Sequence, residues 1–354
     1  MTKTLRSGPV WLMATLVICS VFTGTGAEKS PELPSAHLIA GVPWHEQMNG
    51  LFCGDGALEI LYDYWGPDIE QKPIANVART SSSGTWTFDM RRAGHFSYMS
   101  PAMGRFFPAE VPTAGYPERP LGYAAFSHSS DLPWLAQLKG LIAADVPVIV
   151  LTTFEPDGGG GHYRVVVGYN DANSTVYLMD PWGREQKHET GWTGIFPWTY
   201  DQFSQSWNYS AEGEGHPHFA AVMIPWKVAL ESKGKLAPGS TITVTARITY
   251  PCPPPFDNSR FPARECSARI ILPDGIRLIS GSDVLALGEI KAGSTATATW
   301  KARIEGNCSG KSIRAEAKGI ISGQVPEARW TGETVYYPAY NYTDAIGGEG
   351  VLAL

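Results

Sequence analysis

The chain has 354 residues and a formal net charge of −6 at pH 7, from 28 lysines and arginines and 34 aspartates and glutamates. This length allows two domains with a sizeable buried core, and the hydrophobic content of 43% is typical of a globular protein rather than a disordered or fibrous one. Only 18% of the residues are charged and no basic run is present, so we expect no nucleic-acid partner.

Residues 1–27 have the pattern of a cleavable secretory signal peptide. Lys3 and Arg6 form a charged start, residues 10–22 an apolar stretch, and residues 25–27 a cleavage site of small residues. The apolar stretch is short for a membrane span, and an uncleaved N-terminal anchor is the alternative. We therefore expect a secreted, extracellular or cell-surface protein with no stable membrane span in the mature chain. A polar, proline-bearing linker follows at 28–37, and we expect it to be disordered.

A cysteine stands where a loop is expected to turn into an amphipathic helix. After Cys53, apolar residues recur at steps of three and four up to Gly66-Pro67, as a core-facing helix requires. The first turn of a helix has unpaired N–H groups and the positive end of the helix dipole, which favour a thiolate. Gln47 can add a side-chain N–H to the backbone N–H of Cys53, giving the two donors of an oxyanion hole. The alternative for Cys53 is a buried core cysteine.

The next part of the chain is expected to alternate between regular and irregular structure. A short helix is predicted over 71–80, followed by an irregular stretch over 81–130 that is rich in glycine, proline and aromatic residues. Long irregular stretches inside a domain often form a binding wall or a lid over a cleft. A helix is then predicted with Asp131 as its cap and Pro133 in its first turn. A buried strand is predicted over 146–154.

A hairpin further along carries a candidate base. Strands are predicted over 165–169 and 176–179, with a polar turn at 171–174 between them. Because an antiparallel hairpin brings its open ends together, we expect His162 and Asp180 to lie close in space. A histidine oriented by a carboxylate is the general-base half of a cysteine-nucleophile triad. The alternatives are an ordinary histidine at a strand end and an aspartate in a turn.

Four sequence elements resemble the bacteriocin-processing (double-glycine) peptidase-like family, a branch of the papain-like cysteine peptidases. In chain order they read VPWHEQ, CGDGALEIL, GGHYRVVVGY and DPWG, and the resemblance covers roughly residues 38–226. It implies Cys53 as the nucleophile, His162 as general base and acid, Asp180 as the residue that orients His162, and Gln47 as an oxyanion donor.

The resemblance has two departures. Asp55 and Gly56 follow the Cys53-Gly54 pair, and a carboxylate near the thiol would raise the thiol pKa and blunt it. The best-known relatives are fused to export ATPases, whereas nothing in this sequence resembles a P-loop or a membrane domain.

The pattern changes after residue 226. A helix over 200–207 and a strand over 219–226 close the first part, which predicts an α+β, papain-like domain in which the nucleophile helix packs on an antiparallel sheet. From 227 to 354 short alternating strands are separated by turn residues, which favours an all-β sandwich. This part resembles the immunoglobulin-like modules of secreted microbial enzymes, which implies a spacing role or docking to a cell surface. The predicted domains are therefore a peptidase domain at 38–226 and a β-sandwich at 227–354.

The remaining cysteines predict a disulfide. Cys252 and Cys266 flank a proline-rich loop and are the preferred pair, and Cys266–Cys308 is the alternative. No CxxC or HExxH spacing is present, so we expect no metal and no cofactor.

The sequence thus favours a secreted cysteine peptidase or amide hydrolase that acts on a peptide or protein. The complete set of Gln47, Cys53, His162 and Asp180 supports this hypothesis, which predicts a Cys53 sulfur within about 4 Å of a His162 ring nitrogen. One alternative is transglutaminase-like acyl transfer, which uses the same groups with an amine acceptor. Another is a catalytically silent extracellular binding or adhesion protein on a papain-like scaffold, which Asp55 beside the thiol would favour.

Overall fold

The computed structural model describes residues 32–354 except 105, 113–114, 184–191, 211–214 and 330–335. The predicted signal peptide and the first part of the predicted linker lie outside the described residues. Over the rest of the chain that is described, no helix is both long and apolar enough to cross a membrane.

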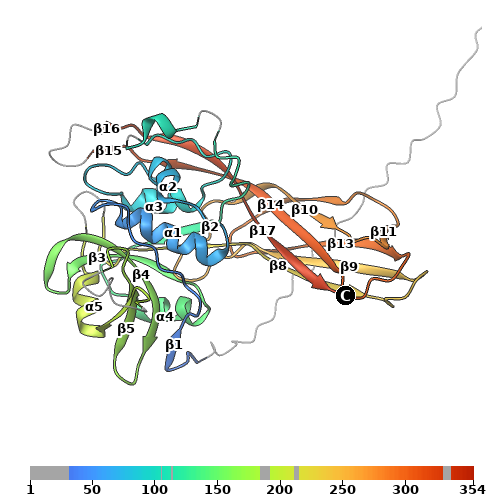
Figure 1. Ribbon diagram of the computed structural model, residues 1–354, viewed down its shortest axis with the longest axis horizontal. Helices are drawn as coiled ribbons and strands as arrows, with labels where there is room; N and C mark the ends of the chain where they lie inside the picture. The colour runs from blue at the N-terminus through green and yellow to red at the C-terminus, as the bar shows by residue number, and fades with distance from the viewer. Residues whose placement is uncertain (1–31, 105, 113–114, 184–191, 211–214, 330–335) are drawn as a thin grey trace, which may run out of the picture. The chain divides into compact units, whose positions relative to one another are not determined.

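The first half of the described chain is built on one antiparallel sheet (Figure 1). The strand order is β2-β7-β3-β4-β5-β6, and β1 pairs with β4 beyond the end of β3. The bounds are Ala36–Leu38 for β1, Ala124–His128 for β2, Val148–Glu155 for β3, Gly158–Asn170 for β4, Thr175–Met179 for β5, Ile195–Thr199 for β6 and Ala220–Ile224 for β7. Because β1 begins at Ala36, the C-terminal end of the predicted linker belongs to this sheet.

Helices cover both faces of the sheet. Their bounds are Cys53–Trp65 for α1, Gln71–Val77 for α2, Thr87–Gly94 for α3, Leu135–Ala143 for α4 and Tyr200–Trp207 for α5, with a 3-10 turn at Pro108–Glu110. Alternate residues of β4 divide the core: Val165 and Val167 pack in the cluster that contains α1, α2 and α3, and Val166 packs in the cluster that contains α4 and α5. The arrangement matches the predicted nucleophile helix packed on an antiparallel sheet.

The stretch predicted as a lid is core structure instead. Within 81–130 lie α3 and β2, and Trp86, Met90 and Phe96 are buried. The region is not irregular, because α3 packs on β2 and β7. Met90 and Phe96 share a core cluster with Ala125 and Met223, whereas Trp86 packs with Ala328 and Tyr337. The predicted cap of α4 was also wrong: the helix begins at Leu135, and Asp131 pairs with exposed His216 at 2.8 Å.

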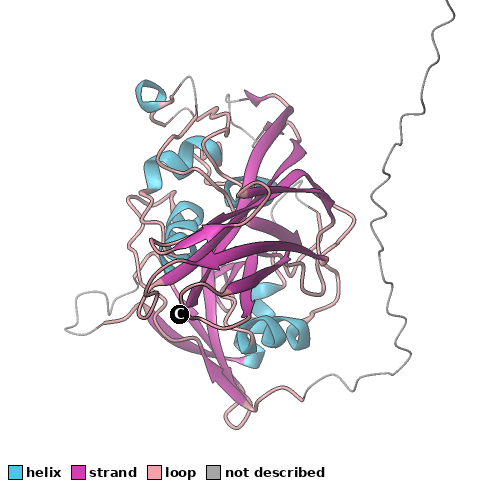
Figure 2. Ribbon diagram, turned by 90° about the vertical axis from the view of Figure 1, so that its right-hand side faces the viewer, coloured by secondary structure: helices cyan, strands magenta, loops and turns pink. Residues whose placement is uncertain are grey.

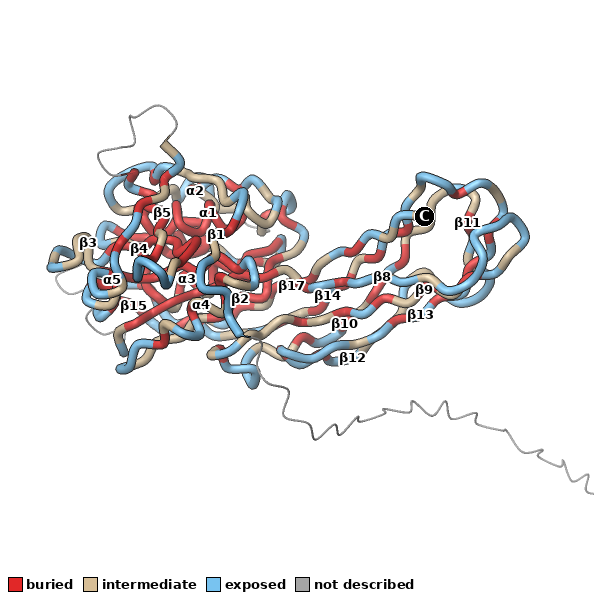
Figure 3. The backbone as a smooth tube through the Cα atoms, turned by 90° about the horizontal axis from the view of Figure 1, so that it is seen from below, coloured by how far each residue is buried: buried red, intermediate tan, exposed pale blue. Residues whose placement is uncertain are grey.

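Two further antiparallel sheets of four strands each, and a two-stranded sheet of β15 (Ala328–Arg329) and β16 (Tyr336–Tyr337), form the part after residue 226 (Figure 2). The strand orders of the two larger sheets are β12-β10-β14-β17 and β11-β13-β9-β8. The bounds are Lys227–Lys233 for β8, Thr241–Thr249 for β9, Ala263–Ile271 for β10, Ile276–Leu278 for β11, Val284–Ile290 for β12, Thr295–Ile304 for β13, Ser312–Val325 for β14 and Tyr340–Ala353 for β17. Buried and exposed residues alternate along these strands (Figure 3), as the sequence predicts. The likeness to immunoglobulin modules stays a prediction.

The predicted disulfides are not formed. Cys252, Cys266 and Cys308 are all free thiols. The Cys266 thiol donates to the carbonyl of Ala263 at 3.1 Å, and Cys252 points to the carbonyl of Phe256 at 3.7 Å. The Cys252 and Cys266 thiols therefore each contact a carbonyl of their own segment.

The long hairpin of β14 and β17 packs against the helical part. Arg92 of α3 donates to Asp344 of β17 at 2.6 Å, and both side chains are at most 1% exposed. Arg79 donates to the carbonyls of Pro326 and Pro338, which lie in the connection between the two strands. Residues 33–354 consequently form one compact unit, and the predicted boundary at 226 is bridged by buried polar contacts.

Candidate active site

Cys53 is the first residue of α1, at the end of a tight turn. The turn is closed by the N–H of Phe52, which donates to the carbonyl of Asn49 at 3.2 Å, and by the N–H of Leu51, which donates to the Asn49 side chain at 2.8 Å. The helix has no side-chain cap, so no capping side chain binds the N–H groups of the turn in which Cys53 stands. Cys53 is 9% exposed, which puts it at the edge of the core rather than deep within it.

The two open ends of the β4–β5 hairpin meet at this helix. His162 lies in β4, where it pairs with Thr152 of β3, and Asp180 follows β5. The Nε2 atom of His162 lies 2.6 Å from Oδ1 of Asp180, and the Cys53 thiol is close enough to the same ring to raise the pKa of His162. With Nε2 bound to the carboxylate, the other ring nitrogen, Nδ1, is the one available to the thiol. The structure therefore brings Cys53, His162 and Asp180 together.

The surroundings of His162 and Asp180 favour the charged forms of both side chains. Burial by itself lowers the pKa of His162, but the charge and hydrogen bond of Asp180, together with Cys53, outweigh it and raise this pKa above its usual value. Burial likewise opposes the charged form of Asp180, yet His162, Arg164 and the N–H of Trp182 hold its pKa far below the usual range. An imidazolium next to a fixed carboxylate is the environment that stabilises a neighbouring thiolate.

Gln47 packs beside the first turn of α1. Its N–H donates to the carbonyl of Pro181 at 2.9 Å, which ties it to the segment after Asp180. A Cβ added at Gly56 would lie 3.4 Å from the Gln47 Cβ, so the two are in close contact. The Nε2 atom donates one N–H to the carbonyl of Asn49 at 2.5 Å. The second N–H of the amide is the donor that an oxyanion hole would require.

Asp55 does not bring a negative charge to the thiol at neutral pH. The side chain is fully buried and accepts a hydrogen bond from Thr80 Oγ1, at 2.9 and 3.0 Å from its two oxygens. Burial raises the pKa of Asp55 to about 8, although the Thr80 hydrogen bond acts in the opposite direction. The Asp55 carboxyl group is therefore mostly protonated at pH 7 and brings little negative charge to the first turn of α1.

Sequence reasoning missed a third partner of Asp180. Arg164, two residues after His162 in β4, donates from Nε to Oδ2 of Asp180 at 2.9 Å and is fully buried. In the sequence it interrupts the run HYRVVV. A buried arginine in an apolar strand requires an acidic partner, which was the signal available in the sequence.

Aromatic side chains line the site next to the histidine. The Phe154 ring lies 5.1 Å from the His162 ring and 6.3 Å from the ring of Trp182. Trp182 is 42% exposed, and its backbone N–H donates to Oδ1 of Asp180 at 2.9 Å. Phe154 lies in strand β3 and Trp182 in the DPWG motif, whereas the sequence had predicted a binding wall or lid at 81–130.

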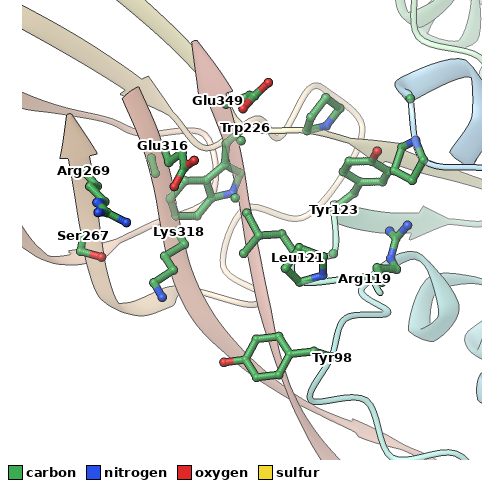
Figure 4. Close-up of a pocket in the computed structure, with 18 of the residues that line it drawn as sticks. Tyr98, Arg119, Leu121, Tyr123, Trp226, Ser267, Arg269, Glu316, Lys318 and Glu349 are labelled. Carbon is green, nitrogen blue, oxygen red and sulfur yellow. The ribbon is translucent and has the colours of Figure 1, made fainter. Parts of the chain in front are cut away.

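Other features lie apart from Cys53. A cavity of about 1130 Å³ is lined by the end of α1, residues 118–123 and strands β10, β14 and β17 (Figure 4). Cys53, His162 and Asp180 are not among its lining residues. Among the residues that the structure describes, no cluster of histidine, cysteine, aspartate or glutamate could hold a metal ion.

Comparisons with known proteins agree with the motifs. Residues 39–213 match the family described as the Peptidase_C39 like family. The sequence has no significant match among the curated proteins. Xylellain, a cysteine protease from Xylella fastidiosa, is similar at 13% identity and a TM-score of 0.36, over 55% of this chain and 87% of that one. The peptidase domain of Streptococcus ComA, a bi-functional ABC transporter involved in a quorum sensing pathway, is similar at 14% identity and a TM-score of 0.31, over 52% of this chain and 99% of that one.

Both TM-scores are too low to carry an argument about this chain, so the assignment depends on the family match and on the motifs that lie within it. Cys53, His162 and Asp180 all fall inside the matched residues. Through residues 39–213, the chain belongs to the Peptidase_C39 like family, the bacteriocin-processing branch of the papain-like cysteine peptidases.

Proposed function

We propose that the protein is a cysteine peptidase or amide hydrolase in which Cys53 is the nucleophile and His162 is the general base and acid. Asp180 orients His162, and Gln47 with the backbone N–H of Cys53 binds the oxyanion. The observation that carries the proposal is the contact of His162 Nε2 with Asp180 Oδ1 at 2.6 Å, in a ring whose pKa the Cys53 thiol also raises. The family match supports the same chemistry.

The reaction follows from these positions. The Cys53 thiolate attacks the carbonyl carbon of the scissile amide, and the oxyanion that forms accepts hydrogen bonds from Gln47 Nε2 and the Cys53 N–H. The His162 imidazolium then donates its Nδ1 proton to the leaving amine as the C–N bond breaks, which leaves a thioester on Cys53. Water attacks the thioester while His162 takes its proton, and the acid is released with the thiolate restored. Asp180 keeps the ring in this orientation throughout.

The buried and mostly neutral Asp55 removes the main argument for a catalytically silent binding protein. Transglutaminase-like transfer would use the same groups, with an amine in place of water in the second step. The substrate is proposed as a peptide or protein. Export through the segment 1–27, and docking through the strands after residue 226, are proposed on the sequence pattern alone.

The proposal is tested by the reactivity of the thiol. Natively folded protein is treated briefly with iodoacetamide between pH 5 and 8, and alkylation of Cys53 is followed by intact mass and peptide mapping. We expect fast alkylation of wild type already at pH 5 to 6, because the imidazolium stabilises the thiolate. The variant His162→Ala should lose at least about tenfold in rate at pH 6, since an unassisted thiol has a pKa near 8.5.

A matched control is available in His37→Ala. His37 is also paired with an aspartate, Asp145, at 2.8 Å, but it lies on β1 and contacts no residue of the candidate site. Its alkylation profile should equal that of wild type. Equal rates in wild type and His162→Ala would overturn the proposal. Where activation is found, a peptide library with and without an added amine distinguishes hydrolysis from acyl transfer, with Cys53→Ala as the inactive reference.

A further inference from the structure

Arg164 is fixed more completely than packing alone would require. Its NH1 donates to the Thr152 hydroxyl at 2.6 Å and to the carbonyl of Thr153 at 2.9 Å, and its NH2 donates to the carbonyl of Phe154 at 2.6 Å. These three acceptors all belong to the end of β3. The remaining donor of the guanidinium, Nε, donates to Oδ2 of Asp180. The guanidinium thus links the end of β3 to the carboxylate.

The two oxygens of the Asp180 carboxylate have different partners. Oδ1 accepts from Trp182 N–H at 2.9 Å and lies 2.6 Å from His162 Nε2, whereas Oδ2 is held by Arg164 at 2.9 Å. Both Asp180 and Arg164 are fully buried. A rotation of the carboxyl group that broke the Arg164 bond would also misdirect the oxygen that orients His162.

Aromatic rings hold the guanidinium in place. Its central carbon lies 4.7 Å from the centre of the Trp198 ring and 5.6 Å from that of Phe154. Phe154 is the residue whose ring also contacts His162, and its carbonyl accepts from Arg164. The same arginine therefore fixes the carboxylate and the aromatic wall beside the histidine.

We propose that Arg164 is the positioning residue of this site: it clamps Asp180 through Oδ2 so that Oδ1 remains bound to His162, and it sets the acid limit of Cys53 reactivity. The inference rests on the proposed function of Cys53, His162 and Asp180. Arg164 touches no reacting atom, and acts only through Asp180 and Phe154.

The groups that face Asp180 and its clamp determine the sign of the pH effect. They are His162 and Arg164 from β4, Cys53 from α1 through the His162 ring, the N–H of Trp182, the Thr152 hydroxyl from β3, and the rings of Phe196 and Trp198 from β6. The folded-state pKa of Asp180 lies below its unfolded value, so the charged carboxylate is lost only when the pH falls through that low value. Removal of the Arg164 cation raises the folded-state pKa of Asp180, so the charged carboxylate is protonated at a higher pH.

The experiment measures the acid midpoint of Cys53 alkylation between pH 3.5 and 8 in wild type, Arg164→Lys and Arg164→Met. We expect the midpoint to rise in Arg164→Met, because a carboxylate released at Oδ2 holds His162 less firmly, so the imidazolium stabilises the Cys53 thiolate less and a higher pH is needed to form it. Arg164→Lys keeps the charge without the fork of donors, so its shift should be smaller. Arg247→Met, at an exposed position of β9, is the control and should match wild type.

Thr152→Val keeps the inference testable where Arg164→Met does not fold. It removes one acceptor of Arg164 while both charges remain, and it should raise the acid midpoint by a fraction of a unit. The ¹⁵N resonances of the His162 ring, measured in Arg164→Lys and Thr152→Val, should move toward those of a ring without a carboxylate partner.

The outcomes distinguish the role of Arg164 from the proposed function of Cys53 and His162. A profile that changes in His162→Ala but keeps its acid midpoint in Arg164→Lys, Arg164→Met and Thr152→Val would overturn the role of Arg164 alone. A profile unaffected by His162→Ala would overturn the proposed function and this inference with it. A rise in midpoint with an unchanged melting temperature at pH 7 supports positioning rather than general stability.

Discussion

At the scale of single residues, Asp55 shows how burial decides the charge next to a nucleophile. The carboxyl group lies in the first turn of α1, and burial raises its pKa to about 8. The unfolded chain would ionise it near its ordinary value of about 3.9. Stability is therefore greatest below that value and is lost as the pH rises toward about 8, because the folded state holds a proton that the unfolded state has released.

We expect Asp55→Asn to flatten this dependence. Asparagine resembles the protonated acid, with one oxygen to accept from Thr80 and an N–H₂ in place of the O–H. The melting temperature of wild type should fall between pH 5 and pH 8, and that of Asp55→Asn should change much less. The exposed Asp157→Asn serves as the control and should follow wild type. A wild-type melting temperature that is constant or rises over this range would contradict the assigned protonation.

At the scale of elements, two helical glycines have opposite surroundings. A Cβ at Gly94, the last residue of α3, would lie 2.5 Å from the Ala125 Cβ and 2.9 Å from Met223, so α3 sits directly on strands β2 and β7. A Cβ at Gly140 in α4 would meet nothing within 4 Å. The first glycine is required by close packing, and the second is not.

Gly94→Ala should therefore destabilise the protein and Gly140→Ala should stabilise it. Overpacking of this kind costs about 1–3 kcal/mol, whereas alanine in an open helical position gains about 0.4–1 kcal/mol. Denaturant unfolding of both variants measures the difference. Equal effects of the two substitutions would mean that α3 does not pack on the sheet as described.

The elements also show what a sequence can reveal. Helix α1 and the β4–β5 hairpin were predictable because periodicity and turn residues are local signals. α3 and β2 were missed because their surroundings are rich in glycine and proline, and their burial depends on β7, far away in the chain. Arg164 was missed for a related reason: its partners lie on β3 and after β5, and only the folded sheet brings them together.

At the scale of the whole molecule, buried polar contacts join the β14–β17 hairpin to the helical part. Asp344 accepts from Arg92 and also from the hydroxyls of Ser97 and Ser100, at 2.6 and 2.7 Å. His95 Nδ1 lies 2.9 Å from the Tyr342 hydroxyl. Arg92 and Asp344 are 252 residues apart in the sequence, which is why no local pattern predicted that these segments meet.

Asp344→Ala should be severely destabilising, by about 3–5 kcal/mol, because it leaves the Arg92 charge buried without its carboxylate. Glu349→Ala, in the same strand, removes one half of an exposed pair with Arg314 and should cost less than about 1 kcal/mol. Equilibrium unfolding in urea measures both. Similar costs for the two variants would show that the buried contact does not join the parts.

The position of β17 has a consequence for how the protein is made. It is the last described strand to leave the ribosome, yet Arg92 and His95 of the helical part depend on it for their partners. The nucleophile helix can thus begin to fold early, but the buried polar contacts of α3 are completed only after β17 has been synthesised. Products that terminate before β17 would leave Arg92 without its carboxylate partner.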